Sequence, residues 1–252
     1  MSVEINCDMG EGFGIYKLGD DEGLMRHISL ANIACGFHAS DPVVMAKTVG
    51  LAKTYDVKVG AHPSFPDLQG FGRREMKMKP NELVAAIIYQ VGALKGFIEA
   101  EGMRLNHIKP HGSLYGMSAR SEDVANAVCE AAGMFGVPLL GMSGTMHEKI
   151  YTARGIPFLA EFYADLDYDH EGNLIITREH KPIDPFQAAA RVARALREGK
   201  VESIQGTDVP VRVDTVCIHS DTPGAVAVAM AVKKVLQTRP LHSAEVSSGG
   251  RS

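Results

Sequence analysis

The stretch HIKPHGSLYG (His107–Gly116) places two groups that can move protons or bind a metal directly after an apolar run. Lys109 and His111 stand where a strand of buried residues should end. A lysine is costly to bury unless it is paired or neutralised, so this position indicates either a functional site or the boundary with solvent. The ends of the other apolar runs decide between these two explanations.

Nearly every apolar run in the sequence ends in a residue of the same kind. These residues are Asp8, His38, His62, Lys109 with His111, Ser143, Glu161 and Asp165, and His219 with Asp221. In a parallel barrel the carboxyl ends of all strands meet on one rim, where the loops that follow them build the active site. We therefore predict that these side chains form a ring of polar groups at the mouth of a barrel.

The first three residues of this ring suggest a metal site. Asp8, His38 and His62 would supply two imidazoles and one carboxylate, a donor set that divalent metals use. The alternative is a hydrogen-bonded polar site in which one histidine acts as general acid or base. The sequence leaves both alternatives open.

A glycine-rich loop follows the first strand-end residue. In NCDMGEGFG, Gly10, Gly12 and Gly14 surround Glu11, and glycine allows the backbone to approach a ligand closely. The loop could form an anion-binding nest, or a tight turn capped by Asp8.

A second loop, GAHPSFPDLQGFGRR, is long and ends in Arg73 and Arg74. It could be a lid that brings a guanidinium to a carboxylate or a phosphate. The alternative is a solvated loop without a role in binding.

Several common motifs do not occur in the sequence. No GxxxxGK[ST] phosphate-binding loop and no G-x-S-x-G serine elbow is present, which leaves Ser143 as a candidate substrate contact only. The acidic run around Asp167 lacks the glycine and glutamate of a calcium loop, so we expect a hairpin that turns at 171–173.

The order of apolar and amphipathic segments predicts an α/β fold. Seven strands are expected at 3–8, 30–38, 57–62, 105–111, 137–143, 157–165 and 214–221, with helices starting near 42, 80, 121, 184 and 222. This alternation favours a parallel sheet covered by helices on both faces, either closed as a barrel or open and doubly wound. One domain over residues 1–242 and a disordered tail over 243–252 are expected.

Composition restricts the cellular context. The net charge of −4 and the lack of a basic stripe argue against a nucleic-acid partner. We see no apolar run of membrane-spanning length and no signal segment, and we expect no contact with a membrane. Four scattered cysteines predict reduced core residues and a cytoplasmic location.

Five of these stretches resemble the family of 5-oxoprolinase A subunits, also called the LamB/YcsF family. They are NCDMGEGFG, ANIACGFHASDP, GAHPSFPDLQGFGRR, KPHGSLY and CIHSD, and the similarity extends from about Val3 to Lys234. The resemblance implies a seven-stranded β/α barrel related to polysaccharide deacetylases. It also implies ATP-dependent conversion of 5-oxo-L-proline to L-glutamate together with subunits B and C. Two positions depart from the family pattern, Leu166 where arginine is usual and Ser220 where glycine is frequent.

The resemblance suggests roles for the ring residues. Subunits B and C would use ATP, and this chain would open the activated ring. Water would be oriented or deprotonated by Asp8, His38 and His62, and oxyanion or phosphate charge would be stabilised by Lys109 with His111. Glu161 or Asp165 would protonate the departing nitrogen, and Arg73 or Arg74 would hold the substrate carboxylate. Further candidate substrate contacts are Glu11, Gly12, Ser143, His219 and Asp221.

Two other functions remain as alternatives. The chain could be a metal-dependent deacetylase or amidohydrolase that acts alone, without ATP. It could also be a non-catalytic subunit that binds the lactam. A homo-oligomer is compatible with each of these functions.

Overall fold

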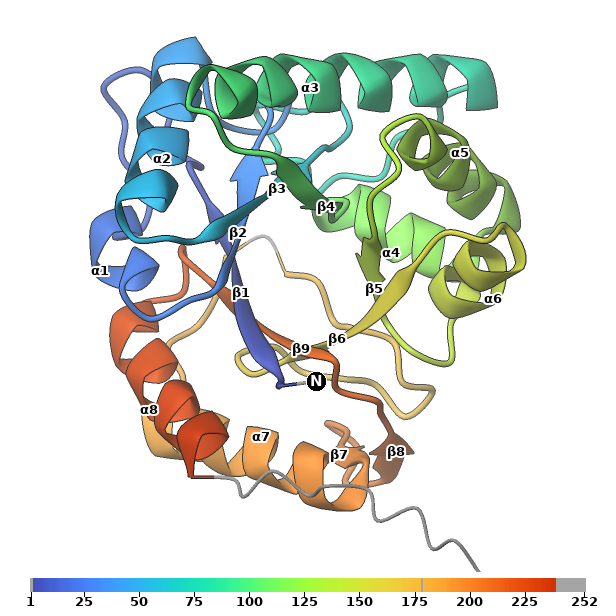
Figure 1. The fold of residues 1–252 in the computed structure, drawn as a ribbon. Helices are drawn as coiled ribbons and strands as arrows, with labels where there is room; N and C mark the ends of the chain where they lie inside the picture. The colour runs from blue at the N-terminus through green and yellow to red at the C-terminus, as the bar shows by residue number, and fades with distance from the viewer. Residues whose placement is uncertain (1, 178, 239–252) are drawn as a thin grey trace, which may run out of the picture.

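Seven parallel strands close into a barrel in the computed structural model, which describes residues 2–177 and 179–238 (Figure 1). Around the barrel they follow the order β1 (Glu4–Met9), β2 (Leu30–Ala34), β3 (Lys58–His62), β4 (Leu105–Ile108), β5 (Leu139–Gly141), β6 (Phe158–Tyr163) and β9 (Thr215–His219). The closed barrel confirms the predicted fold class and excludes the open sheet. One domain over 1–242 stays a prediction, and the predicted tail (243–252) lies outside the described residues.

Helices cover the outside of the barrel. They are α1 (Asp21–Met25), α2 (Pro42–Thr54), α3 (Pro80–Ala100), α4 (Gly112–Arg120), α5 (Glu122–Gly133), α6 (Met146–Ala153), α7 (Pro185–Glu198) and α8 (Ala225–Gln237). Side-chain oxygens of Asp41, Ser121 and Asp184 accept hydrogen bonds from the first turns of α2, α5 and α7, so these helices begin where the capping residues predict. A short antiparallel pair, β7 (Lys200–Glu202) and β8 (Asp208–Pro210), was not predicted.

Alternate residues of the strands separate an apolar layer from a polar one. In β1, Ile5, Cys7 and Met9 belong to the buried hydrophobic core, whereas Asn6 and Asp8 bond across the interior of the barrel. Successive side chains of a strand point to opposite faces, so the apolar set packs under the helices and the polar set fills the barrel.

The barrel interior contains a chain of buried hydrogen bonds beneath the mouth. Asn6 donates to Thr215 Oγ1 at 3.0 Å, and Asn32 donates to Asn6 Oδ1 at 2.8 Å. The ring of His107 lies 2.6 Å from Asn32 Oδ1, and a Cβ at the facing Gly60 would overlap that ring. Glycine is therefore required at this position of β3, because the imidazole occupies the space of a side chain.

The expectation that no apolar run reaches membrane-spanning length is wrong for one covering helix. Helix α3 is long and apolar enough to cross a membrane by length and composition. Its buried residues Leu83, Ile87, Val91 and Leu94 belong to the core, and Gln90 bonds to the backbone of Ser64 beside β3. The apolar composition of α3 is thus used, at least on this face, to cover the barrel.

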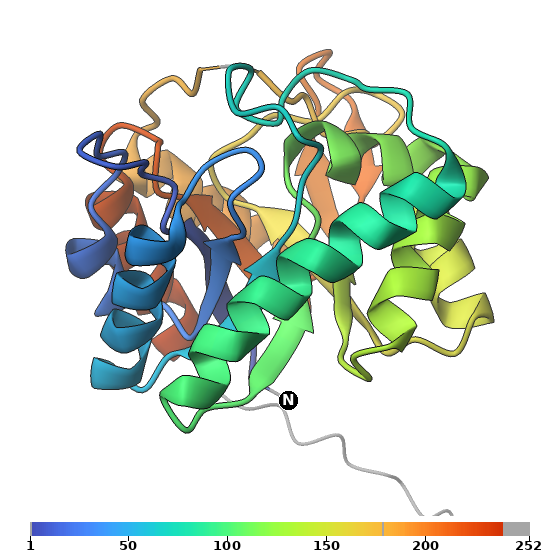
Figure 2. The ribbon, with the colours of Figure 1, turned by 90° about the horizontal axis from the view of Figure 1, so that it is seen from above.

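The carboxyl ends of the strands lie on one side of the molecule, and the longest connections gather there. Figure 2 shows the segment between β3 and α3 and the segment between β6 and α7 at the same edge. The second segment contains the predicted hairpin, since Tyr168 and Leu174 form an antiparallel bridge. Strands β2, β4 and β6 end at Ala34, Ile108 and Tyr163, before the predicted ends at 38, 111 and 165, because the polar residues that follow them belong to these connections.

Candidate active site

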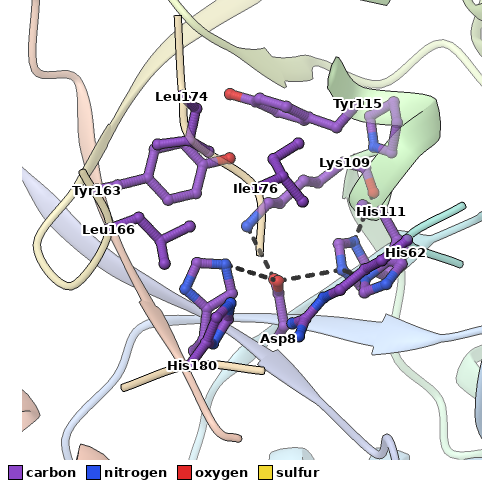
Figure 3. Close-up of a pocket in the computed structure, with 14 residues that line it drawn as sticks. Asp8, His62, Lys109, His111, Tyr115, Tyr163, Leu166, Leu174, Ile176 and His180 are labelled. Carbon is purple, nitrogen blue, oxygen red and sulfur yellow. Dashed lines mark hydrogen bonds and ion pairs between the residues drawn. The ribbon is translucent and has the colours of Figure 1, made fainter. Parts of the chain in front are cut away.

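A pocket with a cavity volume of about 30 Å³ lies at the carboxyl edge of the barrel. Its wall includes Asp8, His62, Lys109, His111 and His219 from strand ends, with Arg73, Tyr115, Tyr163, Leu166, Leu174, Ile176 and His180 around them (Figure 3). Five of the predicted ring residues thus meet in one cavity. This volume is far below the roughly 300 Å³ at which ligand sites begin, so the side chains of the wall nearly fill the pocket.

The lysine cluster, defined as Asp8, Lys109, Glu161 and Cys217, surrounds one ammonium group. Lys109 Nζ donates to Asp8 Oδ1 at 2.8 Å and lies 3.0 Å from Glu161 Oε1. A third contact of 3.0 Å joins it to Cys217 Sγ. Two of the three N–H groups of the ammonium thus donate to Asp8 and Cys217, whereas Glu161 Oε1 is close enough for an ion pair but accepts no hydrogen bond among the described residues.

Electrostatic interactions keep Asp8 and Lys109 ionised. Burial alone disfavours the ammonium, but Asp8, Cys217 and Glu161 outweigh it and raise the pKa of Lys109 well above its usual value. Burial likewise opposes ionisation of Asp8, but His62 and Lys109 lower its pKa well below the usual value. The pocket therefore contains a carboxylate and an ammonium at neutral pH.

His219 approaches the same carboxylate from β9. Its Nε2 lies 3.6 Å from Asp8 Oδ2, and its Nδ1 lies 3.0 Å from Asp165 Oδ1. Asp165 also accepts hydrogen bonds from the backbone N–H of His219 and from the hydroxyl of Thr222. Burial lowers the pKa of His219, but Asp165 outweighs this and raises it, so the imidazolium form is favoured.

The histidine cluster, defined as Glu11, His38, His62 and His111, forms the opposite side of the site. His38 Nε2 lies 3.2 Å from Glu11 Oε1, and His111 Nδ1 lies 3.4 Å from the same oxygen. His62 Nε2 lies 3.0 Å from His111 Nδ1. The rings of His38 and His111 stack with centroids 3.7 Å apart, and Gly72 packs so close to both residues that a Cβ there would stand under 3 Å from each of them.

Backbone carbonyls fix the protonation of two of these rings. His62 Nδ1 donates to the carbonyl of Lys109 at 2.7 Å, and His111 Nε2 donates to the carbonyl of Phe71 at 2.8 Å. A carbonyl only accepts, so in the neutral rings His62 Nε2 and His111 Nδ1 both carry lone pairs. Burial, followed by His38 and His62, lowers the pKa of His111 well below its usual value, which favours the neutral ring.

This geometry changes the predicted metal set. The ligand atoms of Glu11, His38, His62 and His111 all lie within 4.8 Å of one another, whereas Asp8 forms a second such group with Cys217 and His219. The predicted combination of Asp8 with His38 and His62 is therefore not a single ligand group among the described residues. Asp8 lies in contact with Lys109 and His62, and Glu11 is the carboxylate of the group that contains three histidines.

Arg73 and Arg74 point in different directions. Arg73 lines the pocket and pairs with Asp221 at 2.9 Å, and His180 Nδ1 lies 2.9 Å from the other oxygen of that carboxylate. Arg74 pairs with Asp67 within its own loop, and its side chain is 57% exposed. Of the two predicted carboxylate binders, the structure places only Arg73 at the pocket.

Four further predicted residues lie away from the pocket wall. Ser143 accepts a hydrogen bond from the backbone of Arg212. Gly12 lies just before the turn closed by Phe13 and Tyr16, and its carbonyl accepts from the backbone N–H of Ser40. Glu161 lies inside the barrel, where it holds Lys109 and accepts from the hydroxyl of Tyr163 at 2.8 Å. Asp165 lies behind His219. None of them is part of the described wall of this cavity.

Some wall residues were not predicted from the sequence. The alternation of polar residues in β1 and β4 was an available signal for the polar interior, because Asn6 precedes Asp8 by two positions and His107 precedes Lys109 by two. His180 follows no strand and had no such signal. Leu166 lies in the pocket wall with Leu174 and Ile176, so this part of the wall is apolar.

A parallel β/α barrel with a buried ammonium, a carboxylate and a paired histidine in one small pocket at its carboxyl edge has the architecture of a β/α-barrel enzyme. A model of the LamB/YcsF family matches residues 3–249, and the chain belongs to this family. The resemblance seen in the sequence is thereby confirmed.

Curated relatives match along almost their full length. The chain is 49% identical to "Lactam utilization protein lamB" of Emericella nidulans, over 92% of this chain and 93% of the relative. It is 44% identical to the A subunit of 5-oxoprolinase from Bacillus licheniformis, over 93% and 94%. A crystal structure of the lactam utilization protein from Thermus thermophilus superposes with a TM-score of 0.86 at 42% identity, covering 94% of this chain and 96% of that one.

Proposed function

We propose that this chain is the A subunit of a 5-oxoprolinase and opens the lactam ring of 5-oxo-L-proline to give L-glutamate. The observation that carries the proposal is the match to the Bacillus licheniformis protein of that name over 93% of this chain and 94% of that one. The charged groups of the pocket wall suit a small cyclic amide that bears a carboxylate, and the pocket would have to widen to admit it.

ATP and partner subunits complete the proposed reaction. An amide is stabilised by resonance and its nitrogen leaves poorly, so hydrolysis requires activation. The sequence has no GxxxxGK[ST] loop, and we assign the use of ATP to subunits B and C. The four cysteines are free and buried, as expected for a reducing compartment, and we place the enzyme in the cytoplasm.

The proposed chemistry is balanced in three steps. Transfer of the γ-phosphoryl group of ATP to the amide oxygen gives ADP and makes the ring carbon electrophilic. Water adds to that carbon, and the carbon–nitrogen bond breaks as the nitrogen takes a proton, which leaves an acyl phosphate. A second water hydrolyses the acyl phosphate to glutamate and inorganic phosphate.

The wall of the pocket supplies groups for these steps. Lys109 would stabilise the negative charge that develops on oxygen, and one well-placed donor contributes about 3 kcal/mol. Asp8, held by Lys109 and Asn32, would orient the attacking water. His219 is better placed than Asp165 to protonate the nitrogen, because it lines the pocket and Asp165 favours its charged form. Arg73 would bind the substrate carboxylate.

A reconstitution experiment tests the function. The purified chain is mixed with subunits B and C of the same organism, 5-oxo-L-proline and ATP, and glutamate and ADP are followed while each component is omitted in turn. We expect glutamate only from the complete mixture. Glutamate from the chain alone without ATP would instead identify a stand-alone amidohydrolase. Normal turnover with Lys109→Met would identify a non-catalytic subunit.

A further inference from the structure

The histidine cluster has the geometry of an ion-binding site. One ligand atom from each of its four residues lies within 4.8 Å of the other three, and all four residues are buried. Three imidazoles and one carboxylate are donors that Zn²⁺ and related transition metals prefer. We propose that this cluster binds one divalent transition metal ion, with Glu11, His38, His62 and His111 as its ligands.

The lone pairs of the cluster support the proposal. His62 Nε2 lies 3.0 Å from His111 Nδ1 and 3.2 Å from Asp8 Oδ2, and in the neutral rings both of these nitrogens carry lone pairs. Glu11 Oε1 adds a further electron-rich atom 3.4 Å from His111 Nδ1. Two buried atoms, Glu11 Oε2 and His38 Nδ1, have no hydrogen-bond partner among the described residues. A cation among these atoms would convert repulsion between lone pairs into coordination.

His62 and His111 have the hydrogen-bond partners that metal-binding histidines usually have. Histidines that bind metals usually donate their second ring N–H to a carbonyl or a carboxylate, which fixes the ring and its tautomer. His62 does so to the carbonyl of Lys109, and His111 does so to the carbonyl of Phe71. Both rings are therefore held with their free nitrogens turned toward the other ligands.

The neighbouring group of Asp8, Cys217 and His219 is a poorer candidate. The ammonium of Lys109 lies 2.8 Å from Asp8 Oδ1 and 3.0 Å from Cys217 Sγ, so a dication there would meet a positive charge at contact distance. A histidine-to-glutamine substitution at His111, compared with one at His219, therefore distinguishes the two possible positions of the ion.

The test uses the isolated chain, purified without a histidine tag, and needs neither ATP nor the partner subunits. Metal content is measured by elemental mass spectrometry, and binding of Zn²⁺ and Co²⁺ to chelator-treated protein is measured by calorimetry and by the visible spectrum of Co²⁺. We expect about one ion per chain. His111→Gln and Glu11→Gln should each weaken binding by more than the about 10- to 100-fold typical of outer-shell changes. His219→Gln, the matched control, should keep the ion.

Each other outcome counts against the proposal. Absence of bound metal together with no binding of Zn²⁺ or Co²⁺ by the unmodified chain would overturn it without any variant. Binding lost in His219→Gln but kept in His111→Gln would move the ion to the group around Asp8. Circular dichroism checks the fold of each variant, and His38→Gln replaces any that does not fold. Since the readout is metal in the isolated chain, it can fail or succeed independently of the proposed reaction.

Discussion

Lys109 and His111 lie two residues apart, yet the groups around them differ in how their charges are matched. In the lysine cluster an ammonium lies between the carboxylates of Asp8 and Glu161 and also donates to Cys217, although Glu161 Oε1 accepts no hydrogen bond among the described residues. In the histidine cluster lone pairs face one another, and two buried polar atoms have no partner among the described residues.

The difference separates a cluster that contains its own cation from a cluster that lacks one. A buried pair that satisfies its own charges strongly resists removal of either member. A buried group that lacks partners gains from binding something and loses less when it is replaced by a neutral group of the same shape. Substitutions in the two clusters should therefore affect stability very differently.

The largest effect is expected for Lys109→Met, which removes the ammonium that lies between the carboxylates of Asp8 and Glu161. We expect a loss of about 3–5 kcal/mol in the free energy of unfolding, measured by urea denaturation. Glutamate formation by the three-subunit mixture should fall by at least about 10²-fold.

The matched control for this variant is Lys95→Met, whose ammonium pairs with Glu99 on the exposed side of α3. Exposed pairs contribute about 0.5 kcal/mol or less, so this change should leave stability and turnover nearly unaltered. Equal losses for the two variants would show that the lysine cluster is not a tightly matched pair.

An intermediate effect that depends on pH is expected for Asp165→Asn. Asp165 raises the pKa of His219, so their interaction stabilises the folded protein fully below the ordinary histidine value of 6.5 and is lost as pH rises through the raised pKa. Urea denaturation should show a cost of about 2 kcal/mol near pH 6 that becomes smaller toward pH 9. A loss of unfolding free energy that is equal near pH 6 and near pH 9 would contradict a charged His219.

The smallest effect is expected for Glu11→Gln in protein kept in a metal chelator. The carboxylate already has a buried oxygen without a partner among the described residues, so an amide of the same shape should change the unfolding free energy by less than about 1 kcal/mol. Destabilisation as large as that of Lys109→Met would remove the contrast between the clusters. The same variant should show its large effect on metal binding instead.

Much of the fold and part of the site could be predicted from the sequence. Strand ends identified Asp8, His62, Lys109, His111 and His219, because parallel strands of a barrel deliver their carboxyl ends to one rim. The helices opened by Asp41, Ser121 and Asp184 began as their caps indicate. Helix α4 was missed, since its sequence begins with glycine and serine and its buried side depends on tertiary packing.

What could not be predicted was the depth and direction of individual side chains. Glu161 was expected at the rim, but it lies two residues before the last residue of β6, so its carboxylate lies one inward-facing layer lower. Arg73 and Arg74 are neighbours in sequence, and only the folded loop decides that Asp67 takes the second one. The partner of each charge likewise depends on how the strands are staggered, which no single segment encodes.

The apolar part of the pocket wall has a consequence for how fast molecules pass through the site. Leu166, Leu174 and Ile176 belong to one stretch of chain between β6 and α7, which forms a hairpin over the strand ends. If arrival of the lactam and departure of glutamate both require that hairpin to swing outward, its opening rate sets an upper limit on turnover. Shortening the hairpin would then change the turnover rate while leaving the charged residues at the strand ends in position.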